Sequence, residues 1–83
     1  MSDSLLLYIK PRCPWCVEAK DYLDQAGYRY EEINVLADSN AYATMIRLSG
    51  QRLTPTLVVG ELVLGDFGTD ELERFLKKHG IKA

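Results

Sequence analysis

Both cysteines of this 83-residue chain lie in one motif, Cys13-Pro14-Trp15-Cys16. On a helix, residues three apart lie one turn from each other on the same face, so the two sulfurs can react with each other. A thiolate attacks disulfides, and a second thiol nearby releases the mixed disulfide that forms. A structural bridge here would close only a tiny loop and would remove little chain entropy. The motif therefore predicts thiol–disulfide exchange through a redox-active Cys13–Cys16 pair.

The motif lies at the junction between a predicted strand and a predicted helix. Residues 5–9 form a short apolar run, which is typical of a strand buried on both faces. Pro14 suits the first turn of a helix, and Gly27 suits its end. Cys13 then lies at the helix N-terminus, where free N–H groups and the helix dipole stabilise an anion. We expect Cys13 to be the nucleophile and Cys16 to be the resolving thiol, more buried and with an ordinary pKa.

The rest of the chain continues this alternation of strands and helices. A second strand follows the first helix, and the two strands are expected to be parallel because a helix connects them. Gly60-Glu61 suits a two-residue type II′ hairpin turn between the last two strands. The sequence predicts one domain, residues 1–83, with an α/β fold in the order β-α-β-α-β-β-α: a four-stranded mixed sheet and three helices. The predicted strands cover residues 5–9, 28–35, 56–59 and 62–64, and the predicted helices begin near residues 14, 39 and 69.

Composition and charge argue against several kinds of partner. Ten basic and twelve acidic residues give a net charge of -2, without the basic excess of a nucleic-acid surface. No apolar run is long enough to span a bilayer, and no signal-peptide pattern opens the chain. Paired cysteines in one local motif favour a redox role in a reducing compartment. We expect a cytoplasmic monomer that binds neither nucleic acid nor a membrane.

Other roles for the cysteine pair are open at this point. Two cysteines at this spacing are also half of a zinc site, but the only histidine is His79, so a partner subunit would have to complete the site. A dimer that shares an iron–sulfur cluster is the main metal-binding alternative, and otherwise no metal is expected. A binding module with two inert, buried cysteines is the remaining possibility.

The chain resembles the glutaredoxin family over nearly its full length. A Cys-Pro-Tyr-Cys motif after a strand is the family signature, and Trp15 stands here in place of the tyrosine. The resemblance implies a thioredoxin-like fold and a dithiol oxidoreductase that reduces protein disulfides and glutathione mixed disulfides in electron transport and cell redox homeostasis. It also implies that no cofactor is permanently bound. Glutathione is the expected co-substrate, kept reduced by the glutathione reductase system.

The resemblance also implies a set of substrate-binding residues. Leu53-Thr54-Pro55 matches the family's Thr-Val-Pro, in which the proline is cis, faces the active cysteine and follows a residue whose backbone pairs with the substrate cysteine. Thr54 and Pro55 are therefore expected to hold the cysteinyl part of glutathione or of a protein. Trp15 is expected to pack against a bound peptide, although it also fits as a simple rim aromatic.

Charged and helix-terminal residues complete this set. Thr69 and Asp70 resemble the family's site for the γ-glutamyl end of glutathione, and they also fit an ordinary helix cap with an acidic first turn. Lys10 and Arg47 match positions that contact the glycine carboxylate of glutathione in relatives. Each could equally be a solvated surface charge.

Two departures from the family pattern leave the reductant open. Leu53 replaces a threonine, and Gly65-Asp66-Phe67 replaces the family's Gly-Gly entry to the last helix. These features are similar to the glutaredoxin-like hydrogen donors of ribonucleotide reductase, which take electrons from thioredoxin reductase. Asp66 would also repel a carboxylate if it faced the substrate groove.

Overall fold

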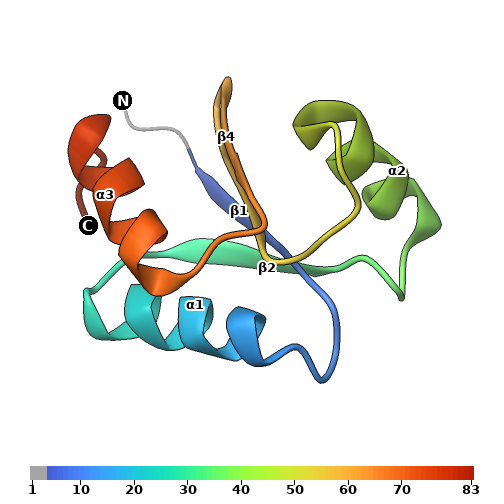
Figure 1. The fold of residues 1–83 in the computed structure, drawn as a ribbon, viewed down its shortest axis with the longest axis horizontal. Coiled ribbons are helices and arrows are strands. Elements are labelled where there is room, and N and C mark those ends of the chain that lie inside the picture. Colours follow the sequence, from blue (N-terminus) through green and yellow to red (C-terminus); the bar gives the residue numbers. More distant parts are fainter. Residues whose placement is uncertain (1–3) are drawn as a thin grey trace.

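Strands and helices alternate along the chain in the computed structural model, which describes residues 4–83 (Figure 1). The elements are β1 (Leu5–Ile9), α1 (Pro14–Gln25), β2 (Tyr30–Asn34), α2 (Ser39–Ser49), β3 (Thr56–Val59), β4 (Leu62–Gly65) and α3 (Thr69–Lys78). The predicted order β-α-β-α-β-β-α is confirmed. No helix in this part of the chain is long and apolar enough to cross a membrane.

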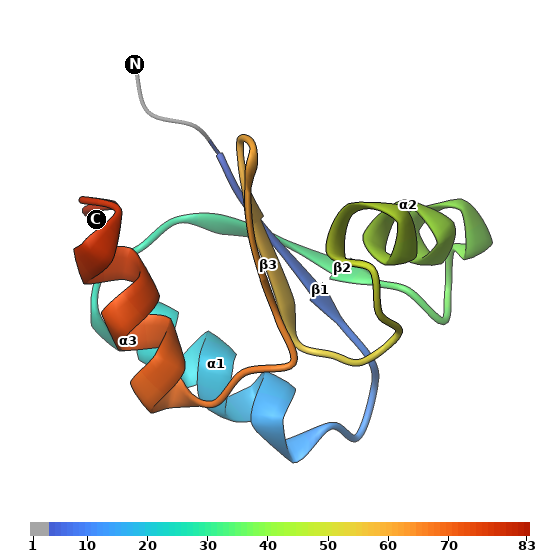
Figure 2. The ribbon, with the colours of Figure 1, turned by 45° about the horizontal axis from the view of Figure 1, so that its top comes forward.

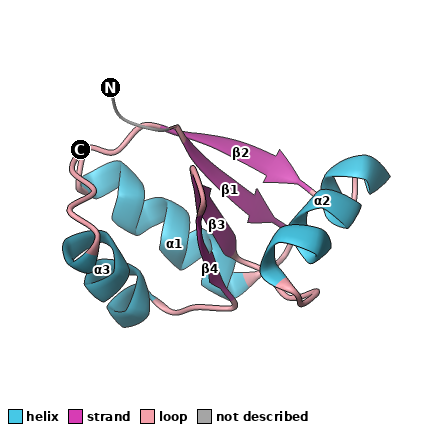
Figure 3. Cartoon of the chain, turned by 90° about the horizontal axis from the view of Figure 1, so that it is seen from above, coloured by secondary structure: helices cyan, strands magenta, loops and turns pink. Residues whose placement is uncertain are grey.

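The strands form one mixed sheet in the order β2-β1-β3-β4 (Figure 3). β1 and β2 are parallel, as their helical connection requires, whereas β3 runs antiparallel to both β1 and β4. β1 is therefore a central strand, which explains its apolar sequence. The chain leaves the carboxyl end of β1 and enters the cysteine motif within a few residues.

Helices cover both faces of the sheet: α1 and α3 cover one, and α2 covers the other (Figure 1 and Figure 2). The core under α1 and α3 includes Leu7, and the smaller core under α2 includes Tyr8. Since these neighbours in β1 point to opposite faces and are both buried, the predicted burial of this strand on both faces is confirmed. The sheet is thus held rigidly between two layers, and the cysteine motif follows directly from its central strand.

Two turns show how local sequence sets the ends of these elements. Gly60 has a φ of 60° in the two-residue connection between β3 and β4, as the predicted type II′ turn requires. β2 begins at Tyr30 rather than at residue 28, because Tyr28 completes the end of α1 instead. Its N–H donates to the Leu23 carbonyl at 2.9 Å after Gly27 takes a left-handed φ of 82°.

Candidate active site

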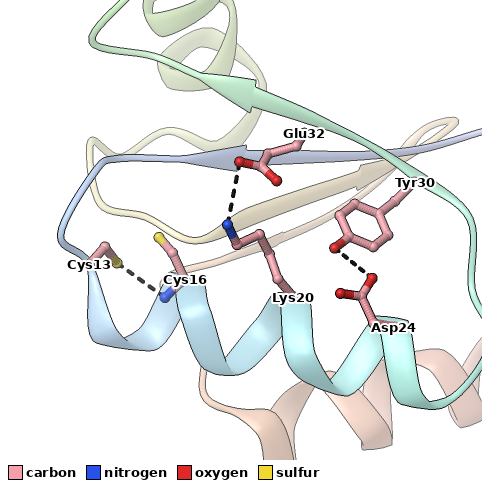
Figure 4. A network of polar contacts seen from close by, with 6 residues as sticks. All are labelled: Cys13, Cys16, Lys20, Asp24, Tyr30 and Glu32. Atoms are coloured by element: carbon pink, nitrogen blue, oxygen red, sulfur yellow. Dashed lines mark hydrogen bonds and ion pairs between the residues drawn. The ribbon is translucent and has the colours of Figure 1, made fainter.

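Cys13 is the N-cap residue of α1, with extended backbone, and Pro14 is the first residue of the helix. Its Sγ accepts a hydrogen bond from the Cys16 N–H at 3.2 Å, as Figure 4 shows. The sulfur therefore occupies the position that a serine or aspartate oxygen takes at ordinary helix starts. A thiolate at this atom gains both a direct N–H donor and the positive end of the helix dipole.

Cys16 lies one turn further along α1, with only 2% of its surface exposed. Burial raises the pKa of the Cys16 thiol, and its interaction with Cys13 raises the pKa further. The expected deeper burial of Cys16 is confirmed, but the expected ordinary pKa is wrong, because that burial disfavours the charged thiolate. The half-buried Cys13 and the buried Cys16 are consequently unequal thiols, as a nucleophile and its resolving partner need to be.

Two side-chain contacts between α1 and β2 hold this helix against the sheet. Lys20 Nζ lies 3.4 Å from Glu32 Oε2, and the Tyr30 hydroxyl donates to Asp24 Oδ1 at 2.9 Å (Figure 4). Partial burial and the Asp24 carboxylate raise the pKa of Tyr30 to about 12. The hydroxyl therefore stays protonated, and this hydrogen bond persists across the physiological pH range.

The loop that precedes β3 brings Thr54 to the nucleophile. The Cys13 thiol lies 3.8 Å from the Thr54 carbonyl oxygen, and the Thr54 hydroxyl lies 3.7 Å from Cys13 Sγ as a donor. The Thr54–Pro55 peptide bond is cis, as the resemblance implied, and Pro55 is buried. The Asp66 N–H donates to the Pro55 carbonyl at 2.9 Å, which links this loop to the segment before α3.

Lys10 lies on the same side of the site, but its ammonium group is already bound. Its Nζ donates to the Arg52 carbonyl at 3.1 Å and lies 5.0 Å from the centre of the Tyr42 ring. The Tyr42 hydroxyl donates to the same carbonyl at 3.2 Å. Lys10 therefore ties the loop before Thr54 to β1, a role that the sequence did not indicate.

Trp15 and the start of α3 form the other side of the site. A shallow pocket of about 240 Å³ is lined by Trp15, Asp66, Phe67, Gly68 and Glu71. Trp15 is 58% exposed, and its ring lies beside Gly68. The Gly68 N–H donates to Glu71 Oε1 at 3.1 Å, so one carboxylate already occupies the entry of this helix.

The remaining predicted residues are less closely tied to the cysteines. Thr69 and Asp70 open α3 behind Gly68, which has no side chain to cap their N–H groups. Arg47 lies exposed in the last turn of α2, and within residues 4–83 its side chain makes no hydrogen bond or ion pair. The structure thus brings Thr54 to Cys13, whereas it shows no contact between Arg47 and the cysteine motif.

Sequence reasoning missed Tyr42, Gln51 and Thr56, whose side chains hold the loop on which Thr54 lies. The signal for Thr56 was its hydroxyl within the apolar run of a buried strand, because a buried hydroxyl needs a hydrogen-bond partner. Nothing in the local sequence marked Gln51 or Tyr42. Their partners depend on how α2 and β3 come together.

Two further observations limit what the site contains. Among residues 4–83, no group of three or more His, Cys, Asp or Glu side chains is placed to hold a metal ion. A pocket of about 690 Å³ lies at the opposite end of β1, lined by Leu5, the start of β2 and the C-terminal residues, and no cysteine borders it.

Comparison with known families agrees with this geometry. The family model described as Glutaredoxin matches residues 5–63, from β1 through the cysteines and Pro55 into β4. The chain belongs to the glutaredoxin family. It is 38% identical over 80 residues to a glutaredoxin of Neisseria meningitidis, a match that covers 95% of this chain and 92% of the relative. Membership makes the chain a thiol–disulfide oxidoreductase, and the Cys13/Cys16 motif lies within the matched residues.

Solved structures show the same fold. A thioredoxin-like protein aligns with a TM-score of 0.80 at 30% identity, covering 88% of this chain and 100% of the other. The Escherichia coli NrdH-redoxin, a glutaredoxin-like protein with a thioredoxin-like activity profile, aligns at 0.73 and 28% identity over 86% and 92% of the two chains. A buckwheat glutaredoxin in complex with glutathione aligns at 0.72 and 27% identity over 98% and 83%. The thioredoxin-like fold of this chain is therefore confirmed.

Proposed function

We propose that this chain is a dithiol glutaredoxin that uses glutathione to reduce protein disulfides and glutathione mixed disulfides. The observation that carries the proposal is the Cys13 sulfur at the N-cap of α1, 3.2 Å from the Cys16 N–H and beside the Thr54 backbone. One chain holds both thiols and this backbone, so a monomer suffices and no bound cofactor is needed. The cytoplasm is the compartment we propose, because reduced thiols persist there.

The first step is attack by the Cys13 thiolate on one sulfur of the substrate disulfide. A bond forms between Cys13 Sγ and that sulfur, the substrate S–S bond breaks, and the other sulfur leaves as a thiolate that takes a proton from water. The Cys16 N–H and the Thr54 hydroxyl are the donors nearest to the attacking sulfur. They hold the charge on Cys13 before the attack.

The second step requires Cys16. Its thiol gives up a proton to solvent and attacks Cys13 Sγ, the mixed disulfide breaks, and the reduced substrate leaves as a thiolate. Two electrons have then passed from the protein to the substrate, and a Cys13–Cys16 disulfide remains. Two glutathione molecules reverse this: the first forms a mixed disulfide with Cys13 and frees Cys16, and the second removes the bound glutathione as glutathione disulfide. Glutathione reductase then reduces that disulfide with NADPH.

The residues around Cys13 offer contacts for each part of glutathione. The Thr54 backbone beside Pro55 would pair with its cysteinyl part, and Trp15 would pack against it. Thr69 and Asp70 at the start of α3 would hold its γ-glutamyl end. Lys10 would bind its glycine carboxylate after leaving the Arg52 carbonyl, together with the exposed Arg47 of α2. The similarity to a buckwheat glutaredoxin solved in complex with glutathione supports glutathione as the ligand.

A second candidate is a donor reduced directly by thioredoxin reductase, for example one that serves ribonucleotide reductase. The likeness to the NrdH-redoxin of Escherichia coli favours it. So does the pocket beside Trp15, because Asp66 and Glu71 line it and would disfavour a carboxylate of glutathione. The two candidates share the Cys13 and Cys16 chemistry. They differ only in the reductant that converts the Cys13–Cys16 disulfide back to two thiols.

A comparison of two reductants tests the proposal. One reaction contains NADPH, glutathione reductase, glutathione and a glutathionylated peptide, and the other contains NADPH, thioredoxin reductase and a protein disulfide without glutathione. We expect this chain to drive NADPH consumption in the first reaction. Turnover in the second reaction alone would replace our proposal with the second candidate. The Cys13→Ser variant is the control in both.

A further inference from the structure

Thr54 presents two backbone groups that differ in their surroundings. Its carbonyl lies against Cys13, whereas its N–H donates to no atom within residues 4–83. This N–H is the group that would pair with the backbone of a docked substrate cysteine. Its direction is therefore as important to docking as the position of the sulfur.

The direction of the Thr54 N–H is set by the carbonyl of Leu53, because the two belong to one planar peptide unit and point in opposite directions when that unit is trans. The Leu53–Thr54 bond is trans, since the one cis bond among the described residues is Thr54–Pro55. The Thr56 hydroxyl donates to the Leu53 carbonyl at 2.8 Å. A group that fixes the position of the Thr56 hydroxyl therefore also fixes the direction of the Thr54 N–H.

Gln51 holds the Thr56 hydroxyl from the other side. Its Nε2 donates to Thr56 Oγ1 at 3.0 Å and to Ser49 Oγ at 3.0 Å, and its Oε1 accepts from the Leu53 N–H. Ser49 in turn donates to the Met45 carbonyl at 2.7 Å. The Ser49 hydroxyl also lies 3.2 Å from a second acceptor, the Gln51 carbonyl. The network connects the last turn of α2 to the first residue of β3 through both peptide groups of Leu53.

Gln51 and Ser49 are partly buried members of this network. Thr56 is fully buried. A Cβ atom added to Gly65, the residue paired with Thr56 in β4, would lie 2.6 Å from Gln51 Nε2. Gly65 is therefore the residue that leaves room for the Gln51 amide. Hydrogen bonds that converge on a fully buried hydroxyl in this way favour one arrangement of the loop.

We infer that Gln51 and Thr56 are positioning residues that aim the Thr54 N–H at the substrate backbone, with Gly65 making room for them. The inference rests on the proposed disulfide reduction, but not on which reductant resets the protein. It predicts that damage to the network weakens the docking of peptide disulfides and leaves the intrinsic reactivity of Cys13 unchanged.

The decisive variant is Thr56→Val, which keeps the shape of the side chain and removes the hydroxyl. Reduction of a peptide disulfide is measured with a chemical dithiol as the electron source, and Cys13 reactivity is measured with iodoacetamide, which needs no backbone pairing. We expect KM for the peptide to rise about fivefold, the loss of roughly one hydrogen bond, with an unchanged alkylation rate. Thr56→Ser should restore the wild-type KM, and Thr44→Val on α2 is the matched control.

Gly65→Ala tests the same network without touching any of its polar groups. Displacement of the Gln51 amide should raise KM as Gln51→Ala does, and the double variant Gly65→Ala/Gln51→Ala should be no worse than Gln51→Ala alone. Gln25→Ala at the end of α1 is the control. If Thr56→Val does not fold, the Gly65→Ala and Gln51→Ala variants still test whether the network positions the Thr54 N–H.

The outcomes separate this inference from the proposed function. A wild-type protein that reduces no disulfide with any dithiol would contradict the proposed function itself. An active wild type whose Thr56→Val or Gln51→Ala variant keeps the wild-type KM would overturn the inference. A variant that slows alkylation as much as peptide reduction would also overturn it, since the network would then act on Cys13 and not on docking.

Discussion

Cys13 lies between two walls that are built differently. The loop wall, residues 51–56, is held by side chains at the Arg52 carbonyl and at both peptide groups of Leu53. The helix wall, residues 66–71 together with Trp15, is anchored by the buried Phe67 but has an open pocket of about 240 Å³. Its one side-chain hydrogen bond runs from the Gly68 N–H to Glu71 Oε1, within its own helix entry. The nucleophile thus has one fixed neighbour and one adaptable neighbour.

This difference matches what the two walls have to recognise. The backbone beside a disulfide is the same in every polypeptide and in glutathione, so a fixed loop wall serves all substrates. Side chains and terminal charges differ between substrates, and these would meet the helix wall, where Asp66, Asp70 and Glu71 concentrate negative charge. We therefore expect changes in the loop wall to affect all disulfides alike and changes in the helix wall to affect selectivity.

The largest effect is expected at the sulfur that both walls share. Cys13→Ser removes the nucleophile, because an alcohol does not ionise near neutral pH, and reduction of every disulfide should fall to the uncatalysed background. Initial rates with a glutathionylated peptide and with a protein disulfide measure this. Residual turnover with either substrate would show that Cys16 acts as a nucleophile.

Cys16→Ser should separate the two kinds of substrate. A glutathione mixed disulfide can be cleared at Cys13 by free glutathione, so its reduction should continue at a comparable rate. Reduction of a protein disulfide needs the resolving thiol, and it should stop at a covalent complex visible by mass spectrometry. The reverse pattern would exchange the roles assigned to the two cysteines.

The pH dependence should report the buried thiol. Because burial raises the pKa of the Cys16 thiol above that of a free cysteine, the thiol is protonated at neutral pH. The release step should accelerate by about tenfold per pH unit between pH 6 and 8, as the thiolate fraction grows. Single-turnover release of a protein mixed disulfide from Cys13 measures this rate. A release rate that is flat across this range would mean that Cys16 is already ionised.

The smallest effect is expected on the helix wall. Asp66→Asn removes one exposed negative charge at the pocket, which should lower KM for a glutathionylated peptide about twofold at low salt and have less effect at high salt. Reduction of a neutral peptide disulfide should be unchanged. Asp21→Asn on α1 is the control. An equal change in KM for both substrates would show that the helix wall does not determine selectivity.

Local features of the site could be predicted because neighbours along the chain determine them. The Cys-Pro-Trp-Cys spacing places one sulfur at the start of a helix and the other a turn behind it, whatever the rest of the molecule does. Gly27 and Gly60 mark the end of a helix and a hairpin turn, because each must take a positive φ. The order of strands and helices followed from the same kind of evidence.

Contacts between distant segments were decided by the tertiary structure alone. Thr54 meets Cys13 across 41 residues, and Lys10 reaches the Arg52 carbonyl across 42. The depth of burial that raises the pKa of Cys16 also depends on how α1 packs on the sheet. The sequence by itself thus determined which atoms react, since that depends on residue type and helical spacing. The fold decided where the Thr54 backbone lies relative to Cys13, because those groups meet only when α2 and β3 pack beside the end of β1.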